Sequence, residues 1–263
     1  MAIIHYILIH VPTFLMGFLI IAIYVISTIV SLIVLRRHYP YKRCKDHNDI
    51  AGFIFATVGV IYAVILAFIV IVTWEQYDKA DEITSKEANC IASLNQDALS
   101  FPAEFRAELR AELKDYVNAI ITDEWKTMER GERSKKVHDI QDKIVRSYSS
   151  FQPKTETQKI YLAESVKKLN EASELRRQRL LYASSGVHPI LYLVLFAGSF
   201  ITIAFSMFFG TENFTEHVLM ASALAAMIAF SLFTIISLDY PFAGRFSIQP
   251  DVFTKVLTTL LGG

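Results

Sequence analysis

Residues 50–73 read IAGFIFATVGVIYAVILAFIVIVT, a run of 24 residues without a charged side chain. As an α-helix this run extends for about 36 Å at a rise of ~1.5 Å per residue, and the hydrocarbon core of a bilayer is ~30 Å thick. Three further apolar stretches occupy residues 12–35, 187–209 and 218–238. Four such stretches in a chain that is 53% hydrophobic predict four transmembrane helices rather than buried helices of a soluble protein.

Polar residues dominate the segment 75–185 between the second and third apolar stretches. No Gly or Pro follows residue 73 until after Leu99, so we expect the second transmembrane helix to continue straight out of the membrane. Apolar residues spaced by three and four predict further helices at 103–129, 134–148 and 155–182. Thr155 and Gln158 have the spacing of a capping box for the last of these helices.

The expected fold is therefore an all-α integral membrane protein with a soluble helical domain inserted between its second and third transmembrane helices. We expect transmembrane helices 1 and 2 in residues 1–74 and a soluble helical bundle in residues 75–185. Transmembrane helices 3 and 4 and a C-terminal tail occupy residues 186–263.

The distribution of charge excludes some functions and leaves the membrane orientation open. Basic and acidic residues number 26 each, so the net charge does not indicate a nucleic-acid partner or a polyanionic substrate. Five basic residues in the loop 36–49 place that loop in the cytoplasm by the positive-inside rule. Nine basic residues near the span ends on the side of the polar segment favour the opposite orientation, so the rule is undecided.

Motifs of catalysis and cofactor binding are missing from the sequence. Cys44 and Cys90 lie in different segments, which argues against a disulfide framework and provides no metal-binding spacing. There is no Gly-rich phosphate loop and no nucleophile elbow, so we expect neither an enzyme nor a cofactor site. No Asp, Glu, Lys or Arg lies deep in an apolar stretch, although ion-coupled transporters depend on such residues.

Small residues line one side of the second apolar stretch at spacings of four, three, four and four: Gly52, Ala56, Gly59, Ala63 and Ala67. Such a stripe allows another helix backbone to approach closely. Two interpretations remain open: packing inside one subunit, or packing of several copies around an axis where this helix lines a pore. In the second interpretation, the copies of Phe55 and of Tyr62 from all subunits would form two rings that narrow the pore and gate it by dewetting. The pore lining would then comprise Gly52, Phe55, Ala56, Gly59, Tyr62, Ala63 and Leu66.

Three acidic residues, Glu75, Asp78 and Glu82, follow this stretch at spacings of three and four and therefore share one helical face. In a ring of subunits they would form an acidic vestibule that concentrates cations at the mouth. The alternative is an ordinary solvated helix face. Lys79, four residues after Glu75, weakens the field because it offers an ion-pair partner.

Several segments together resemble the bestrophin-like membrane domain. They are residues 59–68 (GVIYAVILAF), residues 72–77 (VTWEQY), Glu87-Ala88, residues 123–125, residues 176–180 and residues 238–244. The resemblance implies four spans, a long second helix that leaves the membrane, and a helical cytosolic domain. It also implies a ring of subunits around an axial pore lined by the second helix. The acidic calcium clasp of bestrophins has no convincing equivalent here, so calcium gating is not expected.

We therefore expect a pore-forming homo-oligomer of four or five subunits in the bacterial inner membrane, with the polar domain in the cytoplasm. Its partners are other copies of the chain, the lipid bilayer and permeating ions, with a preference for cations and without nucleic acid. The alternative function is a membrane-anchored scaffold or sensor whose helical domain docks a partner.

Overall fold

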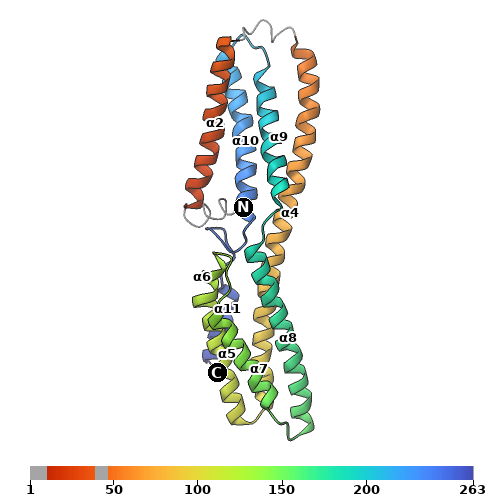
Figure 1. Ribbon diagram of the computed structural model, residues 1–263, viewed down its shortest axis with the longest axis vertical. Helices are drawn as coiled ribbons and strands as arrows, with labels where there is room; N and C mark the ends of the chain where they lie inside the picture. Colours follow the sequence, from red (N-terminus) through yellow and green to blue (C-terminus); the bar gives the residue numbers. More distant parts are fainter. Residues whose placement is uncertain (1–10, 39–46, 263) are drawn as a thin grey trace. The chain divides into compact units, whose positions relative to one another are not determined.

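The computed structural model describes residues 11–38 and 47–262, and every regular element within these ranges is a helix. Four helices are long and apolar enough to cross a membrane. They are α2 (Thr13–His38), α4 (Asn48–Asp97), α9 (Pro189–Met207) and α10 (Phe214–Leu238) (Figure 1). These helices coincide with the four apolar stretches, which confirms the all-α class and the four membrane-length helices.

The chain divides into two compact units, and α4 contributes to both. The apolar unit comprises the described residues up to Glu75 together with Gly186–Asp239. The polar unit comprises Gln76–Ser185 and the described residues from Tyr240 onward. The C-terminal segment after Asp239 thus belongs to the same unit as the helices between α4 and α9.

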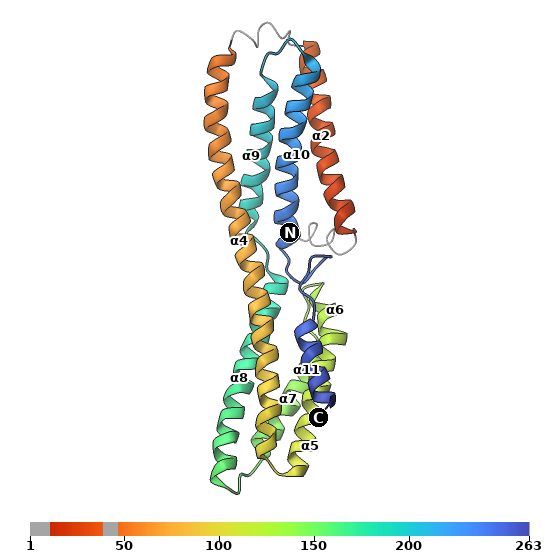
Figure 2. The same ribbon diagram turned by 180° about the vertical axis from the view of Figure 1, so that it is seen from behind.

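Within the apolar unit, the four helices lie side by side in the order α2, α10, α9, α4, as both views agree (Figures 1 and 2). The most extensive packing joins α10 to α2. Gly17 of α2 permits this packing, because a Cβ atom there would come within 3.0 Å of the Phe233 ring. At the other side of the layer, Tyr62 of α4 packs its ring against Gly198 of α9.

The ends of the apolar helices follow local sequence signals. Pro189 occupies the first turn of α9, where its missing N–H leaves no hydrogen bond unmade. Asn213 caps α10 by accepting hydrogen bonds from the first backbone N–H groups of that helix. The Asp239 carboxylate accepts hydrogen bonds from the Val187 backbone N–H at 2.5 Å and from the Tyr192 hydroxyl at 2.7 Å. Asp239 thereby fastens the start of α9 to the end of α10.

The polar unit is a bundle built on the second half of α4. Its remaining elements are η1 (Ala98–Ser100), α5 (Ala103–Ala119), η2 (Ile120–Glu124), α6 (Trp125–Met128), α7 (Lys135–Ser150), α8 (Glu156–Ser184) and α11 (Asp251–Gly262). The predicted helices at 134–148 and 155–182 are confirmed to within two residues at each end. The helix predicted at 103–129 is present as α5 and α6, joined by the π-helical turn η2.

Capping explains where α8 begins, although the geometry differs in detail from the prediction. The Thr155 hydroxyl accepts a hydrogen bond from the Gln158 backbone N–H at 3.2 Å, as a capping box requires. The Gln158 side chain reaches back to the backbone N–H of Lys154 at 2.7 Å, rather than to that of Thr155. The two hydrogen bonds still close the first turn of the helix.

Four buried charges join three helical segments at the centre of the polar unit. The Arg179 guanidinium, which has no exposed surface, donates to Glu87 at 2.7 and 3.1 Å and to Glu124 at 2.8 Å. Arg176 donates to Glu124 at 3.0 Å from Nε. Burial raises the pKa of Glu87 above its usual value. Burial also opposes ionisation of Glu124, but the charge of Arg179 and the hydrogen bonds from Arg176 hold its pKa below the usual range.

Candidate pore-lining helix

One face of α4 is packed inside the apolar unit. Tyr62 and Ile69 are buried, and they are seven residues apart, which is two helical turns. The Tyr62 hydroxyl donates to the Leu195 carbonyl of α9 at 3.2 Å, and a Cβ atom on Gly198 would overlap the Tyr62 ring. The packed face of α4 is therefore fixed by a close fit between this tyrosine and a glycine of α9.

The predicted constriction residues lie on or next to this packed face. Phe55 makes an edge-to-face contact with Phe209, with the ring centroids 5.5 Å apart. Gly52 lies close to the same ring, because a Cβ atom on this glycine would be 3.9 Å from the Phe209 side chain. Phe55 and Tyr62 thus direct their rings toward other parts of their own chain, so their placement does not favour a role in narrowing a path between subunits.

The opposite face of α4 is apolar and uncovered within the chain. Its exposed side chains are Phe53 (79%), Val60 (64%), Val64 (49%), Phe68 (65%) and Ile71 (51%). Their spacings of seven, four, four and three keep them on one side of the helix. These residues were not predicted from the sequence, because the apolar run continues around the whole helix and gives no sign of which face packs inside.

The stripe of small residues lies between these two faces. Ala56, Ala63 and Ala67 are exposed, and a Cβ atom on Gly59 would meet nothing within 4 Å. Leu66 is half-buried. From Ala56 to Ala67 the stripe is therefore open to another helix, because no other part of the described chain lies against it there. Gly52, at the start of the stripe, lies against Phe209 instead.

The three acids beyond the apolar run are all exposed. Glu82 pairs with Lys79 at 2.7 Å and with Lys86 at 2.5 Å, and these hydrogen bonds, that from Lys79 foremost, lower its pKa to about 2. Lys79 thus pairs with Glu82, not with Glu75 as the sequence spacing suggested. Glu75 and Asp78 form no ion pair with any residue that the structure describes.

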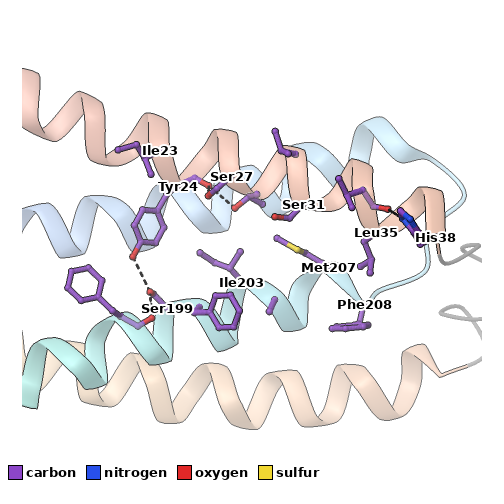
Figure 3. Close-up of a pocket in the computed structure, with 16 residues that line it drawn as sticks. Ile23, Tyr24, Ser27, Ser31, Leu35, His38, Ser199, Ile203, Met207 and Phe208 are labelled. Carbon is purple, nitrogen blue, oxygen red and sulfur yellow. Dashed lines mark hydrogen bonds between the residues drawn. The ribbon is translucent and has the colours of Figure 1, made fainter.

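A groove of 690 Å³ runs between α2 and α9 (Figure 3). The Tyr24 hydroxyl lies 3.1 Å from the Ser199 hydroxyl across it. The hydroxyls of Ser27 and Thr28 donate to the Tyr24 carbonyl, and Ser199 donates to the Phe196 carbonyl. With these four hydroxyl groups committed in this way, the groove presents a mainly apolar wall, which suits an acyl chain or a helix better than a hydrated ion.

The family model of the Bestrophin-like domain matches residues 5–253. The chain belongs to the bestrophin-like family. Solved structures of a bacterial bestrophin homologue from Klebsiella pneumoniae share the fold. One mutant of that homologue has a TM-score of 0.73 at 11% identity, covering 92% of this chain and 98% of the other. A structure of the homologue phased with zinc has a TM-score of 0.68 at 13% identity, covering 92% of this chain and 97% of the other.

A further mutant of the Klebsiella homologue gives a TM-score of 0.67 at 12% identity and covers 96% of this chain and 98% of the other. At these identities the similarity establishes a shared fold and nothing finer. No curated protein matches this bestrophin-like chain. The sequence segments that resemble the bestrophin-like domain thus identified the family correctly.

Proposed function

We propose that this bestrophin-like chain forms a homo-oligomeric ion channel in which α4 lines the path. The observation that carries the proposal is the uncovered face of α4, where large apolar side chains continue along a 50-residue helix into a run of exposed acids. Membership of the family supports the same arrangement, because the resemblance implies a ring with the second helix at its axis.

Several copies are needed for physical reasons. The four apolar helices of one chain carry no charge deep in the apolar stretches and lie side by side in one layer, so a single chain is expected to enclose no hydrated path. A closed ring of copies encloses a lumen by symmetry. The open stripe at Ala56, Gly59 and Ala63 supplies the close approach between neighbouring α4 helices that such a ring requires.

The uncovered face suggests a revised pore lining. In place of Phe55 and Tyr62, the narrow part would be formed by Val60, Val64 and Phe68, with the small residues of the stripe at their side. Rings of such apolar side chains gate by dewetting. Of the remaining predicted lining residues, Gly59 would then lie toward the contact between subunits, whereas Gly52 lies against Phe209 of its own chain and Leu66 is half-buried.

Acidic residues continue the same face beyond the apolar run. Glu75 lies four residues after Ile71, and Asp78 follows three residues later, so all three share one side of the helix. Because Glu75 and Asp78 lack a pairing cation among the described residues, a ring of subunits would concentrate cations at this mouth. We propose a preference for cations on this ground, in a ring of four or five subunits.

The proposed location is the bacterial inner membrane, with the polar unit in the cytoplasm. The competing function is a membrane-anchored scaffold or sensor, in which the helices only anchor the polar unit. Ion flux separates the two. Purified protein in liposomes loaded with potassium chloride should release potassium when a gradient is applied, and protein-free liposomes should not. A scaffold produces no flux above that of protein-free liposomes, and such a result overturns the channel.

A further inference from the structure

A cavity of 340 Å³ lies in the polar unit where α7 begins beside α8. Its lining residues are Arg133, Ser134, Lys135, His138, Ser173, Arg176, Arg177 and Leu180. Five of these eight side chains are basic and none is acidic. A basic concavity of this size in a chain with no net charge is not explained by the overall composition.

The positive charge of the cavity is only partly neutralised. Arg176 is bound to Glu124, and Arg177 forms an ion pair with Glu174 at 2.6 Å. In contrast, Arg133 and Lys135 are exposed and form no ion pair with any residue in the described ranges. Two cationic side chains at the rim are therefore available to a ligand.

Four acids contact residues of the cavity wall without lining the cavity themselves. Glu124 is buried between Arg176 and Arg179, and Glu174 is held by Arg177 on the same helix. Asp123 accepts a hydrogen bond from the Ser134 hydroxyl, and Asp142 lies 3.7 Å from His138. Because none of these carboxylates lines the cavity, they do not occupy the positions that an anion would take.

The start of α7 adds a further favourable field. Ser134 caps this 16-residue helix by accepting a hydrogen bond from the Val137 backbone N–H at 3.2 Å. The backbone N–H groups of the first two helical residues have no intrahelical acceptor, and the positive end of the helix dipole lies at the cavity. Helix starts of this kind favour phosphate groups where side-chain cations accompany them.

We propose that this cavity binds the phosphate group of a small soluble molecule. An arginine fork and an ammonium group at the rim match the charge and geometry of a phosphate dianion. The volume is near the lower end of the range of about 300–1,000 Å³ that holds small ligands, which fits a compact phosphorylated metabolite. The site does not depend on whether the chain conducts ions.

Titration calorimetry of the full-length protein in detergent with inorganic phosphate, at constant chloride, tests the proposal. Wild type should bind, and Arg133→Gln combined with Lys135→Gln should weaken the affinity at least tenfold. The matched control is Lys126→Gln combined with Lys136→Gln, which removes two exposed charges from positions that do not line the cavity and should leave the affinity within twofold. Positions 133 and 135 are also exposed, so melting temperatures should be unchanged.

No binding by wild type, or an equal loss in the control variant, overturns the site. The source of the phosphate is tested in nanodiscs of zwitterionic or anionic phospholipid. Equal affinity for inorganic phosphate in both supports a soluble ligand. A lower affinity in the anionic nanodiscs shows competition by lipid headgroups and overturns the assignment to a soluble molecule.

Discussion

At the scale of single residues, Gly198 decides how α4 packs. Its missing side chain leaves room for the Tyr62 ring, which would lie inside van der Waals contact distance of a Cβ atom at this position. Gly198→Ala should therefore lower the melting temperature, by a destabilisation of about 1–3 kcal/mol for an overpacked contact. The measurement is thermal unfolding in detergent.

Gly59→Ala is the matched control, because a Cβ atom there meets nothing within 4 Å in the chain. In a Tyr62→Ala background, Gly198→Ala should lower the melting temperature less than it does in wild type, since the two residues share one contact. If Gly198→Ala melts at the wild-type temperature, the fit between the ring and the glycine is not what fixes this face.

A second residue prediction concerns Cys90 on α4. The pKa of its thiol is raised to about 11, mainly because the side chain is partly buried. Because the thiolate is the reactive form, modification of Cys90 by a maleimide, measured with Cys44 replaced by Ser, should be slow at pH 7 and should rise steadily to pH 9 and beyond. A small-molecule thiol of pKa ~8.5 approaches its plateau in that range and serves as the control. A plateau below pH 9 for the protein would contradict the buried environment.

At the scale of elements, periodicity predicted the helices but not their contacts. The length and apolar character of residues 50–73 were enough to predict a spanning helix, and the absence of breakers predicted its extension into the polar unit. Which face of α4 packs inside depends on Gly198, which lies 136 positions after Tyr62, so local spacing carries no information about it. For this reason local spacing points to Phe55 and Tyr62 and does not indicate that Val60 and Val64 lie on the uncovered face.

The C-terminal tail shows a similar limit to what local sequence patterns can predict. Residues 251–262 form α11, although no helix was predicted there from the sequence. The helix is anchored by Phe253, which is buried against Trp125, and Trp125 also donates from its indole N–H to the Ile248 carbonyl at 3.1 Å. A short segment of this kind becomes recognisable as structure only when the surface that it covers is known.

The stripe of small residues on α4 leads to a prediction about how subunits assemble. Gly59→Leu fills space that is open in the single chain and that a neighbouring helix would occupy in a ring. It should lower the particle mass measured by light scattering in detergent without unfolding the chain. Ala197→Leu, at an exposed small residue of α9, should leave the mass unchanged. An unchanged mass for Gly59→Leu would remove the stripe from the subunit contact.

At the scale of the whole molecule, the proposed ring joins an apolar path to an acidic mouth. Neutralising Glu75 and Asp78 together, to Gln and Asn, should shift the reversal potential measured in a salt gradient toward the equilibrium potential of the anion. The shift should grow at low ionic strength, where the Debye length is ~30 Å at 0.01 M. Glu104→Gln with Glu108→Gln, which removes two exposed acids of α5, is the charge-matched control. A wild-type channel that prefers anions would contradict this assignment.

Cysteine accessibility tests the central claim, a water-filled path along the uncovered face of α4. In a background where Cys44 and Cys90 are replaced by Ser, Val64→Cys places a thiol on that face, and Phe200→Cys places one on the exposed surface of α9. A charged, membrane-impermeant thiol reagent should reduce liposome ion flux through Val64→Cys and leave flux through Phe200→Cys unchanged. Flux through Val64→Cys that is insensitive to the reagent, or equal inhibition of both variants, would contradict a path lined by α4.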